Sequence, residues 1–293
     1  MTQRSSVSPR LLALVLALVL AVAGGAYFIG ARSSNEQSQQ TATESAQGED
    51  GQASSDQSLP VLANPNIRQE VTPGTQGLDG PEPLADGSYD ASIFGPKAPI
   101  KSAEDVRNVH RRNPQDPFAI GAVDAPVVIA EFSDFECPYC SQWSNNTEPA
   151  LIKEYVDRGL VRIEWNDMPV NGPAAEAAAK AGRAAAAQGK FDAFRRAFYQ
   201  STAEISGHPN FTLEDYVRFA KQAGVPNIEQ FRQQASDGTY DEVIEQAKRY
   251  GASIGIQGTP AFVVGEQYIS GAQPLDVFMR AIDQELQKVQ QQQ

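Results

Sequence analysis

The cysteines constrain this chain more than any other feature. Among 293 residues there are two, Cys137 and Cys140, and they enclose a Pro-Tyr dipeptide. A β-branched run from Val127 to Phe132 precedes this motif, and residues of helical composition follow it. The sequence therefore predicts a strand that leads through the motif into a helix. A scaffold stapled by many disulfides is excluded, because it would need more cysteines.

A cysteine at the start of a helix is a better nucleophile than an ordinary thiol. Unpaired backbone N–H groups and the positive end of the helix dipole stabilise a thiolate there, and its pKa can fall from about 8.5 to roughly 3.5–7.5. We therefore expect Cys137 to be the nucleophile and Cys140, one turn later, to be the resolving thiol. Pro138 presets the helical turn but offers no N–H donor, and Tyr139 places an aromatic side chain between the cysteines.

Three other interpretations of the motif are weaker. A structural disulfide across so short a loop would constrain the unfolded chain little. A zinc site needs four ligands, and the two histidines, His110 and His208, lie in unrelated contexts. Two inert cysteines fit poorly behind an N-terminal export signal, which residues 11–29 provide. We therefore interpret the motif as a redox pair, and we expect no metal and no other cofactor.

Two features outside the motif extend this interpretation. Glu131 lies six residues before Cys137 on the predicted strand, where partial burial would raise its pKa and let it exchange a proton with Cys140. The alternative is a solvated glutamate at the end of a strand. Thr259 and Pro260 open a later apolar run. The bond before a proline is where cis peptides occur, and a strand opened by proline leaves the preceding backbone free to pair with a peptide.

The region before residue 101 predicts export and tethering. Residues 11–29 carry no charge and are long enough to cross a bilayer, and the arginines before them place residues 1–10 in the cytoplasm. The alternative is a cleavable signal peptide, because Ala21-Val22-Ala23 fits a cleavage pattern. Residues 30–100, rich in Ser, Gln, Pro and Gly, predict a disordered tether. Both alternatives export the C-terminal part, either anchored to the cell membrane or secreted.

Residues 101–289 predict the folded part, in the order β-α-β, several helices, then β-β-α. An alternating run at 160–168 predicts a second strand, parallel to the first, and Pro149 predicts a break or a kink in the helix between them. Residues 173–250 predict helices throughout, with Thr212 as one N-cap. A sheet with a helical insertion between its two halves is the economical α/β solution. The other expected elements are a helix over Ala103–Arg112, a hairpin over Thr259–Gly265 and Gln267–Gly271, and a helix over Leu275–Val289.

One stretch carries a family resemblance. Phe132-Ser-Asp-Phe-Glu-Cys-Pro-Tyr-Cys140, with Gly258-Thr-Pro-Ala-Phe-Val-Val264 downstream and helices between, resembles the DsbA-like thioredoxin-fold thiol–disulfide oxidoreductases. The segment before it, from Asp116-Pro117 to Asp124-Ala-Pro-Val-Val128, is similar to the corresponding segment of the membrane-anchored, extracytoplasmic members in Gram-positive bacteria. The resemblance covers about residues 112–288. It departs between the cysteines, where the best-known oxidases of the family have Pro-His.

The resemblance implies both a fold and a site. The fold is a thioredoxin fold with β-α-β and β-β-α halves and an inserted helical domain over residues 173–250. Cys137 and Cys140 are then the redox pair, and Glu131 is the buried acid beneath them. Pro260 would be the cis-proline that faces the disulfide, and Thr259 would contact bound substrate.

We therefore expect a membrane-tethered enzyme that transfers its disulfide to exported, cysteine-containing proteins. The chain has no second cysteine pair, so reoxidation requires a separate membrane redox partner. The alternatives are an extracytoplasmic reductase or isomerase, which is kept reduced, and a peptide-binding chaperone module without redox activity. The net charge of −12 argues against nucleic acid as a partner, because phosphate binding needs a basic face.

Overall fold

The computed structural model describes residues 81–95 and 100–291, so the predicted segment at 11–29 and most of the predicted tether lie outside the described residues. Contacts divide the chain into residues 1–59 and 60–293, and every described residue belongs to the second unit. Within the described residues, no helix combines the length and the apolar character that a membrane span requires.

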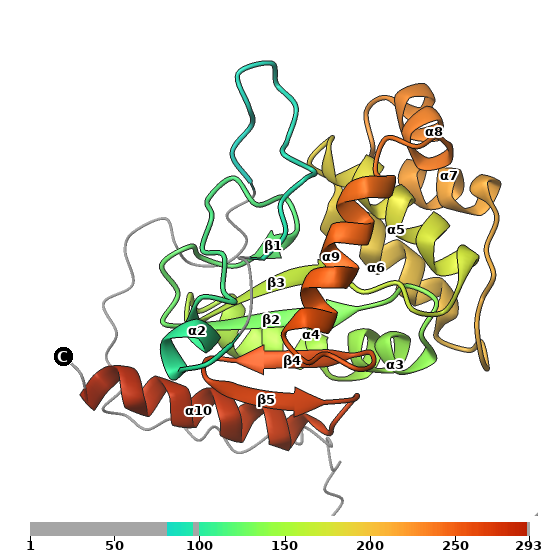
Figure 1. Cartoon of the computed structure of the whole chain (residues 1–293). Helices are drawn as coiled ribbons and strands as arrows, with labels where there is room; N and C mark the ends of the chain where they lie inside the picture. Colours follow the sequence, from blue (N-terminus) through green and yellow to red (C-terminus); the bar gives the residue numbers. More distant parts are fainter. Residues whose placement is uncertain (1–80, 96–99, 292–293) are drawn as a thin grey trace, which may run out of the picture. The chain divides into compact units, whose positions relative to one another are not determined.

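Five strands of the described chain form one mixed sheet, in the order β1-β3-β2-β4-β5 (Figure 1). Strands β2 (Val127–Ser133) and β3 (Val161–Asp167) are parallel. Strand β4 (Ala261–Val264) is antiparallel to β2, and β5 (Gln267–Ser270) is antiparallel to β4. These pairings confirm the predicted β-α-β and β-β-α halves. Strand β1 (Ala119–Ile120), antiparallel to β3, is too short for a sequence pattern to predict.

The segment between β2 and β3 contains three consecutive helical pieces. Helix α3 (Pro138–Asn146) begins inside the cysteine motif, α4 (Glu148–Leu151) follows, and a π-helical turn, η1 (Ile152–Val156), completes the connection. The predicted break is present, but it falls at Thr147 rather than at Pro149. Proline is tolerated there because the first turn of a new helix does not need its missing N–H.

Apolar side chains cover both faces of the sheet. On one face three rings join α3 to β4 and to α10 (Leu275–Gln291). The ring centroid of Phe262 lies 4.7 Å from that of Trp143 and 4.9 Å from that of Phe278. On the other face Phe132 packs in a cluster with residues of α9 (Asp241–Ser253). Because neighbouring residues of a strand point to opposite faces, the residues next to Phe132 point towards α3.

Helices α5 to α9 form the predicted helical insertion between β3 and β4, and α5 to α8 lie together to one side of the sheet (Figure 1). Four aromatic residues of α6, Phe191, Phe194, Phe198 and Tyr199, are buried, as their helical spacing predicts. Thr212 caps α7 in a capping box, which confirms that prediction. The bounds are α5 Pro173–Ala186, α6 Phe191–Thr202, α7 Leu213–Gln222 and α8 Ile228–Ser236.

The polar side chains of β3 are buried, although their alternation with apolar residues is typical of a strand with one solvated face. Arg162 Nε lies 2.8 Å from Glu164 Oε1, and Arg111 Nε lies 2.5 Å from Asp116 Oδ2. These four side chains are at most 4% exposed. Arg111, from the segment before β2, also lowers the pKa of Glu164 by its charge, and a buried ion needs such a partner in order to be tolerated.

Helix α2 (Ala103–Arg107) is shorter than predicted. The backbone N–H groups of Arg111 and Arg112 donate to the carboxylate of Glu164 at 2.7 Å and 2.8 Å, in place of helical carbonyls. Arg112 also has a positive φ of 46°, which a continuing right-handed helix does not allow. The helix prediction over Ala103–Arg112 is therefore wrong after Arg107.

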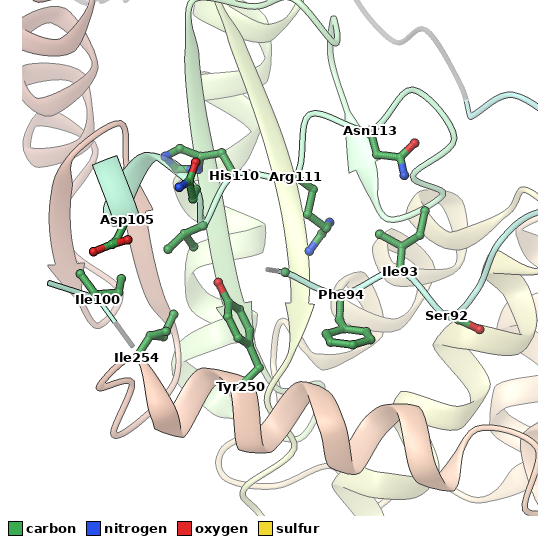
Figure 2. Close-up of a pocket in the computed structure, with 13 residues that line it drawn as sticks. Ser92, Ile93, Phe94, Ile100, Asp105, His110, Arg111, Asn113, Tyr250 and Ile254 are labelled. Carbon is green, nitrogen blue, oxygen red and sulfur yellow. The ribbon is translucent and has the colours of Figure 1, made fainter. Parts of the chain in front are cut away.

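Part of the predicted tether is described, and it lies against the insertion. Ala91 is buried and its carbonyl accepts a hydrogen bond from Arg183, while the N–H of Tyr89 donates to the carbonyl of Ala187 at 3.3 Å. Residues 92–95 also line a cavity of about 520 Å³, into which Tyr250 projects from α9 (Figure 2). Neither cysteine lines this cavity.

Candidate active site

The cysteine motif lies where β2 passes into α3. Cys137 is the N-cap residue of α3 with an extended backbone (φ −77°, ψ 121°), and Pro138 is the first helical residue. The Cys137 N–H donates to the carbonyl of Asp134 at 3.0 Å, and the Cys137 carbonyl accepts from the N–H of Ser141 at 3.1 Å. Both cysteines are free thiols, with Cys137 6% exposed and Cys140 fully buried. Cys137 is thus the more accessible thiol of the pair.

The two thiols differ in acidity. The pKa of Cys137 is lowered to about 6, chiefly because the Cys140 thiol hydrogen-bonds to its sulfur, with the backbone N–H groups of Cys140 and Tyr139 adding to the effect. Burial raises the pKa of Cys140 well above its usual value, and the neighbouring Cys137 sulfur raises it further. Near neutral pH the pair therefore contains one thiolate and one thiol, a combination suited to disulfide exchange.

A distant segment completes the surroundings of Cys137. The peptide bond between Thr259 and Pro260 is cis, and Cys137 Sγ lies 3.3 Å from the carbonyl oxygen of Thr259. The antiparallel pairing of β2 with β4 explains this approach, because Phe132 lies opposite Ala261. The structure thus brings together the motif and the Thr-Pro pair that the sequence singled out.

Glu131 is buried in β2, opposite Trp165 of β3 and Phe262 of β4. It is 1% exposed, and its Oε1 has no hydrogen-bond partner among the described residues, so the solvated alternative is wrong. Burial raises its pKa to about 8, which keeps the carboxyl neutral near pH 7. The Ser133 side chain, on the same face of the strand, lowers the pKa of both Glu131 and Cys140, and its hydroxyl therefore lies near both groups.

A buried ion pair lies near Glu131. Arg195 of α6 donates to both carboxylate oxygens of Glu148, at 2.8 Å and 2.6 Å, and Ser144 Oγ donates to the same carboxylate at 2.8 Å. The Arg195 charge lowers the pKa of Glu131 and the Glu148 charge raises it, so both are close enough to act on that carboxyl. Asp192, whose side chain is 19% exposed, also accepts from Arg195 and extends the polar group towards solvent.

Three other side chains that the sequence analysis named have different surroundings. Tyr139 is 62% exposed, so its ring is available to a partner. His110 and His208 lie at separate places, where a ring nitrogen of His110 contacts the carbonyl of Gly265 and one of His208 contacts the carbonyl of Glu136. In the part of the chain that the structure describes, no group of three or more His, Cys, Asp or Glu is arranged to hold a metal ion.

Two acids shortly before the motif, Asp134 and Glu136, were not predicted as part of the site. Asp134 accepts hydrogen bonds from the backbone N–H groups of Glu136, Val170 and Asn171 and from the Asn171 amide, at 2.7–3.0 Å. Its carbonyl accepts from the hydroxyl of Tyr199 at 3.2 Å. Glu136 is fully buried. The Ser-Asp-Phe-Glu pattern was the available signal, because acids next to a buried strand need partners from elsewhere in the fold.

Two family models and several known proteins match this chain. A family model described as thioredoxin matches residues 113–284, and one described as the N-terminal domain of DsbA matches residues 35–109. Over 177 residues the chain is 30% identical to the probable disulfide bond formation protein D of Bacillus cereus. That match covers 58% of this chain and 79% of the relative.

Two solved structures share the fold. Oxidised BdbD of Bacillus subtilis superimposes with a TM-score of 0.55 at 22% identity, covering 58% of this chain and 92% of that one. DsbA of Chlamydia trachomatis superimposes with a TM-score of 0.52 at 23% identity, covering 66% and 99%. At these identities the likeness concerns the fold alone, a sheet that carries a helical insertion.

Proposed function

Because this chain belongs to the DsbA-like thioredoxin-fold thiol–disulfide oxidoreductases, we propose that it introduces disulfides into exported proteins, with Cys137 and Cys140 as its redox pair. The position of Cys137 carries the proposal. It caps α3, it is the more exposed of the two thiols, and its sulfur lies against the carbonyl of Thr259. An incoming thiolate would reach this sulfur before that of Cys140.

The proposed cycle begins with a Cys137–Cys140 disulfide. A substrate thiolate attacks Cys137 Sγ, a bond forms between the two sulfurs, and the Cys137–Cys140 bond breaks. Cys140 leaves as a thiolate and takes up a proton. A second substrate thiolate then attacks the substrate sulfur of this mixed disulfide and releases Cys137 as a thiolate. The two substrate thiols together lose two electrons, which the cysteine pair accepts. They also lose two protons: one matches the proton that Cys140 takes up, and the other enters solvent.

Cys137 and three residues around the pair receive proposed roles. The lowered pKa of Cys137 makes it a good leaving group in the second step. Glu131, neutral near pH 7, is the proposed proton donor to the Cys140 thiolate, with Ser133 nearby. Thr259 and Pro260 are the proposed contact for an extended substrate peptide, because a strand end can pair with it.

We further propose that the enzyme acts outside the cytoplasm and is tethered by residues 11–29. The uncharged length of that segment supports the tether. A separate membrane redox partner, of the quinone-linked class, would accept the two electrons and restore the disulfide. The sequence supports a separate oxidant, because it contains no cysteine besides Cys137 and Cys140.

Trapping of mixed disulfides tests the proposal. Cys140→Ser keeps the nucleophile and removes the thiol that would resolve a mixed disulfide. We expect exported proteins to accumulate in covalent complexes with this variant and to be released by dithiothreitol. The matched control carries Cys137→Ser as well and should trap nothing. If Cys140→Ser traps no exported protein through Cys137, the proposal is wrong.

The redox state of the pair in cells separates the remaining alternatives. A pair that is mostly disulfide at steady state is the expected result for an oxidase, whereas a mostly dithiol pair would indicate a reductase or isomerase. Full retention of function in Cys137→Ala would instead favour a peptide-binding chaperone, which does not need the thiol. The redox state is measured by acid trapping of the cells followed by alkylation with a mass-shifting reagent.

A further inference from the structure

The residue directly before the nucleophile is held at three points. Glu136 is fully buried, and its N–H donates to Asp134 Oδ1 at 2.8 Å. Its carbonyl accepts from Nδ1 of His208 at 2.8 Å, and its Oε2 accepts from the backbone N–H of Asn210 at 2.9 Å. Since a carbonyl can only accept, His208 carries a proton on Nδ1. Two of these three contacts come from outside the segment that contains Cys137.

Both outside contacts come from one loop. Residues 203–212, which we call the α6–α7 loop, connect two helices of the insertion. Asn210 has a positive φ of 50°, a conformation that asparagine tolerates better than most residues. In this conformation the backbone N–H of Asn210 donates to Glu136 Oε2. Directly after Asn210, the ring of Phe211 packs on the rings of Phe198 and Phe219, with centroids 5.2 Å and 5.1 Å away.

A carboxylate is unfavourable to bury at this position. Burial raises the pKa of the Glu136 carboxyl more than the N–H groups of Asn210 and Phe211 lower it. Its Oε1 has no hydrogen-bond partner among the described residues. A buried polar atom without a partner is unfavourable, and an apolar side chain of similar volume would avoid that cost. What an apolar side chain would not supply is the acceptor for Asn210. The carboxylate therefore provides a second link between the loop and the motif, besides the contact of His208 with the Glu136 carbonyl.

We propose that Glu136 is a positioning residue, which joins the α6–α7 loop to the backbone of Cys137 so that the loop and the nucleophile keep one relative position during disulfide transfer. This inference rests on the proposed function. Attack on a disulfide needs the incoming sulfur in line with the breaking bond, so a small displacement of Cys137 slows the reaction. Both loop contacts fall on Glu136, one residue before the reacting sulfur, so the loop would then fix the backbone from which Cys137 projects.

Two pairs of variants in the full chain test this link. Glu136→Ala removes the acceptor, whereas Glu136→Gln keeps a side-chain oxygen for Asn210. Asn210→Pro removes the donor and cannot adopt a positive φ, whereas Asn210→Gly keeps the N–H and favours that φ. We expect Glu136→Ala and Asn210→Pro to transfer disulfides to a reduced two-cysteine peptide about tenfold more slowly. We expect Glu136→Gln and Asn210→Gly to stay within about twofold of wild type.

Two further measurements separate the link from a general loss of structure. Glu136→Ala combined with Asn210→Pro should be no slower than the slower single variant, because both substitutions break the same hydrogen bond. Hydrogen exchange across residues 203–212 should increase in the two slow variants and not in the two conservative ones. Glu285→Gln, which changes a buried carboxylate of α10, serves as the matched control and should leave rate and exchange unchanged.

The outcomes distinguish this inference from the proposed function. A wild-type chain that transfers no disulfide would overturn both. An active wild type with a Glu136→Ala variant of equal rate would overturn the positioning role alone. A Glu136→Gln variant as slow as Glu136→Ala would also overturn it. So would a double variant whose loss of rate is the product of the losses in the two single variants. If Glu136→Ala does not fold, the comparison of Asn210→Pro with Asn210→Gly decides in the same way.

Discussion

The sulfur of Cys137 lies 3.3 Å from the carbonyl oxygen of Thr259, although 122 positions separate the two residues in the chain. As a thiol, Cys137 donates to that carbonyl. As a thiolate, it accepts from the Cys140 thiol and from backbone N–H groups at the start of α3. The candidate nucleophile is therefore held between a helix start and a strand start, and its ionisation can be measured directly.

Alkylation of the reduced protein should begin at a lower pH for Cys137 than for an ordinary thiol. Only the thiolate reacts, and its pKa is lowered to about 6, so the rate should rise with pH up to that value and level off above it. Cys140 should remain unreactive near neutral pH, because burial raises its pKa. Mass spectrometry after timed treatment with iodoacetamide at several pH values measures both. If the alkylation rates of the two cysteines rose over the same pH range, Cys137 would not be the thiol with the lowered pKa.

Glu131→Gln should stabilise the fold at neutral pH. The folded pKa of Glu131, about 8, lies above the unfolded value of about 4.3. The unfolded state therefore loses its proton first, and the free energy of unfolding falls as pH rises from about 4 to 8. Glutamine cannot ionise, so the variant should gain on the order of 3 kcal/mol at pH 7 and nothing near pH 4.

Urea unfolding at the two pH values measures this difference. Glu285→Gln is again a suitable control, because the Glu285 carboxylate accepts hydrogen bonds from Lys288 and Gln267. A similar gain at both pH values for Glu131→Gln would show that Glu131 is ionised in the folded protein. In the proposed reaction the same variant should also slow disulfide transfer, since it removes the donor of the Cys140 proton.

Removing one partner of the Arg195–Glu148 pair should destabilise the protein more than removing both. Arg195→Met would leave the buried Glu148 carboxylate without two of its donors, at a cost of about 3–5 kcal/mol. Arg195→Met together with Glu148→Leu leaves no unpaired charge and should recover part of that loss. Urea unfolding at pH 7 gives both values. Losses that add in the double variant would show that the two side chains act independently.

Gly182→Ala tests the packing behind the motif. A Cβ at this position of α5 would lie 2.9 Å from Cε2 of Phe135. That ring is in contact with Trp165 and with aromatic residues of α6, so it has little room to move. Alanine would gain about 1 kcal/mol in helix propensity, but overpacking of a tight core costs about 1–3 kcal/mol. We expect a net loss of thermal stability, and a stabilised variant would show that Phe135 can shift.

Most strands and helices follow from short-range patterns in the sequence. The β-branched run at Val127 predicts β2, the alternation at 160–168 predicts β3, and the Thr212 cap predicts the start of α7. The motif itself indicates a low-pKa thiol, because its position at a helix start is a local property. Helix α2 shows the limit of this reasoning, because its end is determined by Glu164 on a distant strand.

The surroundings of the thiols are decided only by the tertiary structure. The register between β2 and β4 brings Thr259 to Cys137, and no local pattern contains that register. The pKa of Glu131 depends on its burial between two strands and on the charge of Arg195, which the insertion supplies. The link from Glu136 to Asn210 likewise joins residues 74 positions apart. Backbone propensity acts over a few residues, whereas pKa values and hydrogen-bond partners depend on which distant groups the fold places within a few ångströms.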